Sequence, residues 1–150
     1  MLNLAKQLDT ASKAFEFQIT GEEPINGRAA WRLQAVPRPD YKGEYAFLRN
    51  IRGTLWIDKS DYQWVKVEAE AFDAISIGFF IARISKGVKI IFENVRVNDE
   101  LWEPKHLSYS NVNARIALFK TFHGDQQYDF NEYRKVQDIA KAIAADDPCK

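Results

Sequence analysis

The chain has 150 residues, of which 46% are hydrophobic, and its 21 basic side chains balance its 21 acidic side chains. This length fits one domain over residues 1–150, the single Cys149 excludes a disulfide framework, and the lack of net charge argues against a generic nucleic-acid binder. No apolar run approaches the roughly 20 residues that a transmembrane helix needs. The high aromatic content, 13% of the residues, favours strands.

The first half of the chain changes from a helical period to a strand period. Apolar residues before residue 13 follow a weak helical spacing, whereas apolar and polar residues alternate from Phe15 onward. Turn chemistry at Asn26-Gly27 and at residues 58–61 separates the alternating segments. These patterns predict a helix at 1–13, strands at 15–20, 29–35, 51–57 and 62–72, turns at 21–28 and 58–61, and a loop at 37–50 with a short helical turn near 45–48.

The second half continues the strand pattern with one ambiguous segment. Residues 75–84 are apolar on both faces and fit either a buried strand or a short helix. Pro104 inside a strand pattern indicates an edge strand or a bulge. The patterns predict strands at 88–97, 101–110 and 111–122, a stop at Gly124, one more short strand near 128–130, and a helix at 132–145.

These elements define the fold class. About eight or nine strands follow each other with little helix between them, and no βαβ alternation is present. The sequence therefore predicts a mainly β fold with minor α, built on an antiparallel sheet in which residues 51–72 form a central hairpin.

Residues that could carry catalysis do not form a recognised constellation. His106 and His123 lack the spacing of a metal-binding pair, and Cys149 lies in an acidic tail that is unfavourable for a thiolate. The seven glycines are too far apart for a phosphate-binding loop. We expect no enzymatic activity, no metal site and no cofactor.

Two carboxylates on one strand have a simpler interpretation than catalysis. Glu68 and Glu70 lie side by side, whereas the paired carboxylates of a glycosidase face each other across a cleft. We interpret them as part of a solvated sheet face crossed by salt bridges. Arg28 and Arg32 are either their partners or ligands of an anion, and the sequence does not choose between these roles.

Several motifs resemble one family. The stretch GTLWIDKSDYQWVKVEAE at 53–70 contains G-x-L-W-I-D followed by Y-x-x-V-x-V-E. The strands in NGRAAWRLQAVP and VNDELWEPKHLSYS and the later stretch YDFNEYRKV are similar to segments of the same group. These motifs resemble the bacterial outer-membrane lipoprotein-sorting proteins of the LolA/LolB-like superfamily, and the likeness covers roughly residues 15–136.

The resemblance implies a curved antiparallel sheet that forms an unclosed half-barrel, with helices against its concave side. It also implies a hydrophobic hollow that holds lipid or lipoprotein acyl chains without chemistry, in a carrier or sensor of the bacterial periplasm or cell envelope. The chain shows fewer strands than this family, no signal peptide and no lipobox cysteine. We therefore expect the C-terminal part of a longer exported protein, and no membrane anchor of the LolB type.

Aromatic residues are the candidate lining of such a hollow. Trp56 and Trp64 lie on either side of one turn, and each interrupts a polar strand face. An aromatic ring in that position either covers the stem of a charged neighbour or lines a hollow. The candidate ligand-binding residues are Trp31, Trp56, Trp64, Phe79, Phe80, Phe92 and Trp102.

A second interpretation from a different class stays open. The chain could be a structural or interaction domain with a filled core that associates through its sheet. Because an exposed sheet edge invites pairing with another chain, a homodimer through a sheet edge is the partner that this alternative implies. A continuous apolar hollow would favour the acyl-chain binder, and a filled interior would favour the interaction domain.

Overall fold

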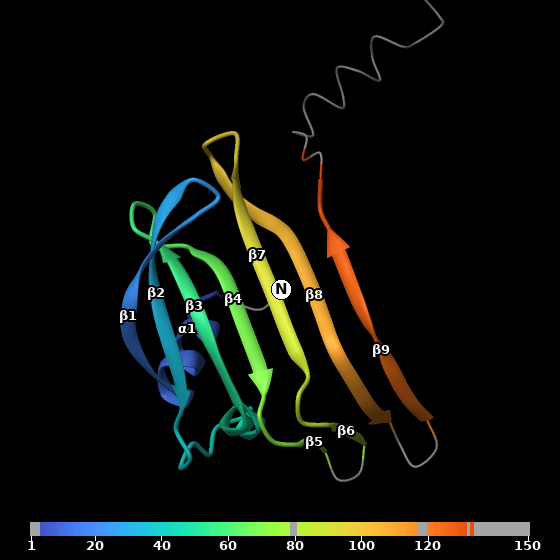
Figure 1. Cartoon of the computed structure of the whole chain (residues 1–150). Helices are drawn as coiled ribbons and strands as arrows, with labels where there is room; N and C mark the ends of the chain where they lie inside the picture. The colour runs from blue at the N-terminus through green and yellow to red at the C-terminus, as the bar shows by residue number, and fades with distance from the viewer. Residues whose placement is uncertain (1–3, 79–80, 117–119, 132, 134–150) are drawn as a thin grey trace, which may run out of the picture.

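The described part of the chain folds into a single antiparallel sheet with the helix α1 against it (Figure 1). The computed structural model describes residues 4–78, 81–116, 120–131 and 133. The elements are α1 (Leu4–Ala14), β1 (Phe15–Ile25), β2 (Arg28–Pro37), the 3-10 helix η1 (Ala46–Asn50), β3 (Ile51–Asp58), β4 (Trp64–Ala71), β5 (Ile75–Ile77), β6 (Ala82–Ile84), β7 (Lys89–Val97), β8 (Leu101–Ile116) and β9 (Lys120–Asp129).

The strand order confirms the expected fold class. Strands follow the order β1-β2-β3-β4-β7-β8-β6-β5, with β9 paired to β8, and every pairing is antiparallel. Among the described strands, β1 and β9 each have one strand neighbour, so the sheet is not closed into a barrel. The central position of the β3–β4 hairpin, predicted for 51–72, is confirmed. The helix predicted at 132–145 lies outside the described residues.

The sheet curls strongly where its hairpin turns gather. Three strands separate β2 from β8, which would place them roughly 19 Å apart in a flat sheet. Nevertheless the Lys105 Nζ donates to the Asn26 side-chain oxygen at 2.6 Å. The two hairpins that carry these residues therefore bend toward one another, as the upper part of Figure 1 shows. We call this the tip end; the opposite end, with residues 38–50, 72–78 and 81–88, is the base end.

The turn between β1 and β2 is shorter than the predicted turn at 21–28. β1 continues to Ile25, and only Asn26 and Gly27 form the turn, both with positive φ. This is the backbone conformation that two-residue hairpin turns require. The pairing of β1 with β2 continues beyond Gly21 after a register shift between Ile19 and Gly21. Pro24 has no backbone N–H to donate, but β1 is an edge strand, where proline is tolerated. The prediction of a turn from Gly21 and Pro24 was wrong.

The last two strands differ from the prediction. β8 is one strand of 16 residues rather than two strands at 101–110 and 111–122, and β9 begins at Lys120. A register shift between Tyr109 and Val112, with Asn111 at φ 58, carries β8 past the expected break. Gly124 does not end a strand but lies inside β9. A bulge preserves the alternation on each side of it, so the sequence pattern alone does not reveal it.

The ambiguous segment 75–84 is neither a buried strand nor a helix. Its described residues form the short hairpin β5–β6, in which Gly78 has a positive φ and Ile75 is the one buried side chain among those residues. Other predictions are confirmed: a helix at the N-terminus, a helical turn near 45–48, and a bulge beside Pro104, where the pairing shifts between Glu93 and Asn94.

Candidate functional site on the apolar face

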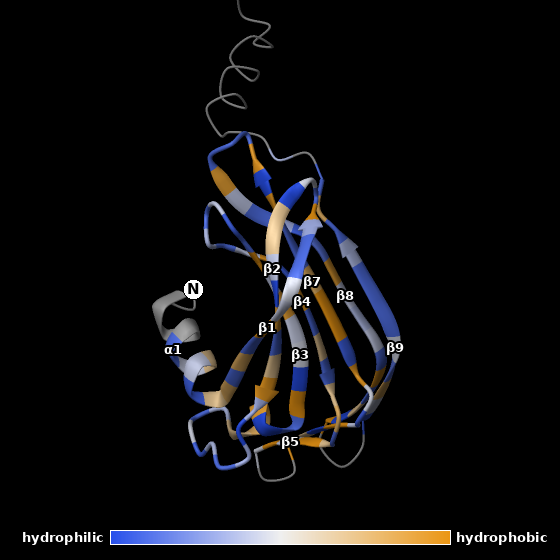
Figure 2. Ribbon diagram, turned by 60° about the vertical axis from the view of Figure 1, so that its left-hand side comes forward, coloured by the Kyte–Doolittle hydropathy of each residue, from blue (hydrophilic) through white to orange (hydrophobic). Residues whose placement is uncertain are grey.

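One face of the sheet carries an uninterrupted row of apolar side chains. The cross-strand register aligns seven consecutive neighbours on β1, β2, β3, β4, β7, β8 and β9, namely Ile19, Leu33, Leu55, Val67, Phe92, Leu107 and Tyr128. We call the side of the sheet that this row occupies the apolar face. Figure 2 shows the matching bands of hydrophobic residues along the bowed strands. Leu55, in the middle, is 6% exposed, whereas Ile19 and Tyr128 at the two edges are exposed.

The next row is made of small residues and leaves space below α1. Ala35 pairs with Gly53, and Gly53 pairs with Ala69. A cavity of about 100 Å³ lies over this row, and Ala11 of α1 is part of its lining. Its lining is almost entirely apolar and includes Phe15, Phe17, Ile51, Leu55, Trp64 and Val67. The small row therefore produces a groove that α1 covers.

Gly53 is required by the close approach of β3 and β4. A Cβ built on Gly53 would lie 2.4 Å from the backbone oxygen of Glu68, which is part of a paired strand and cannot move aside. A larger residue at this position would push the strands apart. The floor of the groove is thus determined by the backbone packing of the central hairpin.

A second apolar cavity adjoins the first toward the base end. It has a volume of about 130 Å³ and shares Ile51 and Ala69 with the cavity below α1. η1 contributes Phe47 to its lining, the β5–β6 hairpin contributes Ile75, Ile77 and Ile84, and Val88 precedes β7. Part of this lining belongs to the small hydrophobic core of buried residues at Ala71, Ile75 and Val88. The two cavities form neighbouring parts of one apolar groove.

Three of the predicted lining residues lie on the apolar face. Trp31 is opposite Ile57, Ile57 is opposite Trp64, and Phe92 belongs to the seven-strand row. Trp64 reaches this face because a bulge at Val65 shifts the register of β4. The prediction that Trp64 interrupts a polar face was therefore wrong. Trp64 also lines the cavity below α1.

Trp56 lies on the opposite face and covers charged neighbours. Its indole Nε1 donates to Glu23 at 2.9 Å, and the Lys66 Nζ lies 4.9 Å from its ring centroid. Burial lowers the pKa of Lys66, but its ion pair with Glu68 and the nearby charges of Glu93 and Glu23 outweigh burial and raise that pKa. Trp56 thus adopts the first of the two roles considered for it, that of covering a charged stem.

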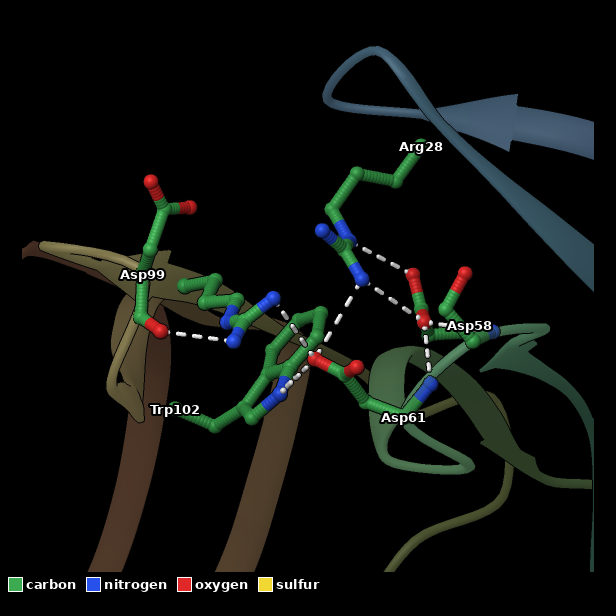
Figure 3. A network of polar contacts seen from close by, with 7 residues as sticks. Arg28, Asp58, Asp61, Asp99 and Trp102 are labelled. Atoms are coloured by element: carbon green, nitrogen blue, oxygen red, sulfur yellow. Dashed lines mark hydrogen bonds and ion pairs between the residues drawn. The ribbon is translucent and has the colours of Figure 1, made fainter.

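Trp102 belongs to a polar network at the tip end (Figure 3). Its indole Nε1 donates to the Asp61 carboxylate at 3.1 Å, and the Arg28 guanidinium lies 5.5 Å from its ring. Arg28 also bonds Asp58 and Asp61, and Arg96 reaches Asp61 at 3.4 Å. The network joins the β1–β2, β3–β4 and β7–β8 turns. Because its arginines and aspartates pair with one another, it offers no unpaired charge to a ligand.

The remaining predicted residues, Phe79 and Phe80, lie outside the described residues. The prediction missed most of the apolar face: Leu33 of the seven-strand row, and the groove residues Leu55, Val67, Ala35, Gly53 and Ala69. The sequence feature that could have identified them is the alternation of apolar and polar residues along each strand. This alternation shows which residues share a face of one strand, but not which residues of different strands become neighbours.

The carboxylates on the opposite face have local partners. Glu68 pairs with Lys66 at 2.7 Å and Glu70 with Arg52 at 3.3 Å. The expected solvated face with salt bridges is therefore present, but Arg28 and Arg32 are not the partners. Arg28 binds the tip-end aspartates, and the Arg32 Nε donates to the Thr20 hydroxyl. A cavity of about 360 Å³ lies on the face that carries Glu68 and Glu70. Its polar lining residues include Gln34, Arg52, Glu68, Glu70 and Lys89.

The His106 imidazole contacts Asp129 on the neighbouring strand, with 2.6 Å between Nδ1 and Oδ1. Hydrogen bonds from His106 and Gln127 lower the pKa of the Asp129 carboxyl.

Among the described residues, no group of three or more His, Cys, Asp or Glu side chains is arranged to hold a metal ion. None of the helices in this part of the chain has the length and apolar character to cross a membrane.

Comparison of the chain with protein-family models, with curated proteins and with solved structures finds no match. The likeness to the lipoprotein-sorting proteins thus stays a hypothesis based on the motifs quoted above. The structure contributes an independent feature, which is the apolar groove.

Proposed function

We propose that this chain binds a lipid or lipoprotein acyl chain along its apolar face, without catalysis, as a carrier or sensor in a bacterial periplasm or cell envelope. The observation that carries the proposal is the apolar groove below α1 and η1, which continues into a row of apolar side chains across seven strands. The motif resemblance supports the cellular location.

The shape of the groove suits an extended apolar ligand. Its two cavities hold about 100 and 130 Å³, whereas sites that enclose a drug-sized ligand usually hold roughly 300–1,000 Å³. An acyl chain would therefore lie along the groove, with α1 displaced from it. Burial offers about 0.8 kcal/mol per CH₂ before ordering costs, which is enough for micromolar binding of a long chain.

The attachment of α1 is compatible with such a displacement. Among the backbone hydrogen bonds of the described residues, one joins α1 to the loop after β2. The Arg38 N–H donates to the Ala14 oxygen, at the C-terminal end of the helix, at 2.8 Å. Ala14 itself is fully buried. The helix would pivot at this end while Ala11 leaves the groove.

Titration with a fluorescent fatty acid, read through quenching of tryptophan emission, tests the proposal. Ala69 lines both cavities, so Ala69→Phe should fill the groove and weaken binding at least tenfold. Ser108→Phe is the matched control, because the register places Ser108 on the opposite face of the sheet. The proposal fails if the parent binds no tighter than an unrelated β domain, or if the two variants lose affinity equally.

One observation favours a second function, that of an interaction domain which dimerises through a sheet edge. Every residue of β9 is exposed, and β9 pairs only with β8 among the described strands. Such an edge presents unpaired backbone groups to another chain. Sedimentation velocity at increasing concentration decides this point: a dimer that Gln127→Pro abolishes supports edge pairing, and a monomer at all concentrations excludes it.

A further inference from the structure

Two arginines face each other on neighbouring strands at the base end of the sheet. The β6–β8 register places Arg83 directly opposite Arg115, and Ser76 and Thr121 extend the same row on either side. Both arginines are exposed. Like charges in directly opposite positions destabilise a sheet. This pairing is therefore a feature that the stability of the fold does not explain.

Neither guanidinium is neutralised within the described part of the chain. Ion pairs involve many other cations of the protein, including Arg28, Arg52, Arg96 and Lys66, but none joins Arg83 or Arg115 to a carboxylate of the described residues. Guanidinium groups bind phosphate oxygens in two-point geometry, and neighbouring hydroxyls are further donors for the same group. The row is suited to a phosphate-bearing partner.

The charge distribution of the whole chain points in the same direction. The base end, residues 38–50, 72–78 and 81–88, and the adjoining strand ends 115–116 and 120–122 carry seven basic and three acidic side chains. Tip-end segments 22–28, 58–61 and 96–105 carry four basic and seven acidic ones. A chain without net charge is thus polarised along its strands, and its base end would turn toward an anionic surface.

Exposed apolar side chains lie at the same strand ends as the two arginines, and the register places Ile77, Ile116 and Phe122 on the opposite face of the sheet. Ile81, 64% exposed, follows the β5–β6 turn, and Ile77 precedes it; Ile116 and Phe122 lie at the adjoining ends of β8 and β9. The lower part of Figure 1 shows these strand ends side by side. The base end therefore carries cations on one face and exposed apolar side chains on the other. Interfacial membrane binding uses both kinds of side chain, since apolar side chains enter the headgroup boundary while cations bind lipid phosphates.

We propose that the base end docks on an anionic phospholipid bilayer, with Arg83 and Arg115 on lipid phosphates and Ile77 and Ile81 in the headgroup boundary. The groove cavity near η1 includes Ile77 in its lining, so a docked chain would hold the groove next to the membrane. The proposal rests on side chains other than those of the groove floor and does not require acyl-chain binding to be correct.

The test is co-sedimentation of the full chain with vesicles of phosphatidylcholine mixed with phosphatidylglycerol, compared with pure phosphatidylcholine vesicles. We expect binding to the anionic vesicles only, and weaker binding at high salt. Each cation near such a surface contributes about a fivefold factor, so Arg83→Gln with Arg115→Gln should weaken partitioning about thirtyfold. Arg32→Gln, an exposed arginine on a distant part of the sheet, is the matched control and should leave partitioning unchanged.

A second variant examines the apolar part of the surface. Ile77→Ser with Ile81→Ser retains every charge and should weaken partitioning at least tenfold. Ala69→Phe should sediment like the parent, which separates failure of this proposal from failure of acyl-chain binding. Equal binding to neutral vesicles, or equal losses for the Arg32 control and the arginine pair, would overturn the proposal. Displacement from vesicles by inorganic phosphate, but not by sodium chloride at the same ionic strength, would also overturn it, because the arginines would then form a site for free phosphate.

Discussion

Arg28 in β2 and Asp58 at the end of β3 form a two-point ion pair, with 2.7 Å from Nε to Oδ2 and 3.0 Å from Nη2 to Oδ1. The carboxylate is 1% exposed and also accepts the backbone N–H groups of Ser60 and Asp61. Both oxygens of this buried carboxylate therefore accept hydrogen bonds. Through Asp61 and Trp102 the pair joins the three hairpin turns of the tip end.

Replacing the arginine of this pair should destabilise the fold substantially. Arg28→Gln leaves the buried Asp58 carboxylate with only backbone donors, and loss of one hydrogen-bond partner of a buried polar group costs about 1–3 kcal/mol. Urea denaturation measures the loss in free energy of unfolding. Arg32→Gln, which removes an exposed side chain bonded to Thr20, should change that free energy by less than about 0.5 kcal/mol. Equal losses in the two variants would contradict the role given to Arg28.

The same pair predicts a pH dependence of stability. The hydrogen bond from Arg28, with those from the backbone, lowers the pKa of Asp58 from 3.8 to about 2. Because the unfolded chain takes up this proton first, the stabilisation is complete above about pH 5 and is lost as the pH falls toward 2. We expect the free energy of unfolding to decrease by about 2 kcal/mol over this interval from Asp58 alone. Denaturation curves of the parent and of Asp58→Asn should therefore converge at low pH; a constant difference between them would contradict the assignment.

A charge placed in the seven-strand row should be poorly tolerated. Val67 lies between Leu55 and Phe92, and Val67→Asp would put an unpaired carboxylate on the apolar face at a cost of several kcal/mol. Ser108→Asp introduces the same group on the opposite face and should cost much less. Thermal unfolding followed by circular dichroism compares the two. If Val67→Asp melts like the parent, the register of β4 is wrong.

The arginine pair of the base end predicts a gain in stability on substitution. Removal of one of two like charges in directly opposite positions should raise the free energy of unfolding by about 0.2–1 kcal/mol. Arg83→Gln should therefore melt at or above the temperature of the parent, whereas Arg52→Gln, which loses its partner Glu70, should melt at or below it. A large destabilisation by Arg83→Gln would show that this side chain has a structural role.

The sequence by itself determined the elements whose signals are local. Alternation between Phe15 and Ala71 identified the first four strands, because successive side chains of a strand point to opposite faces. The Asn26-Gly27 pair located its turn, because these residues tolerate the positive φ that a two-residue hairpin needs. The excess of aromatic and β-branched residues gave the fold class. All of these depend on residues within a few positions of one another.

Only the tertiary structure decided what the strands bring together. The bulge at Val65 moved Trp64 to the apolar face, and the bulge beside Asn111 joined two expected strands into β8. Register placed Gly53 between Ala35 and Ala69 to form the groove, and placed Arg83 opposite Arg115. A shift of one residue in pairing exchanges the two faces of a strand. Each strand's sequence is compatible with several such alignments, and the choice among them depends on contacts between residues far apart in the chain.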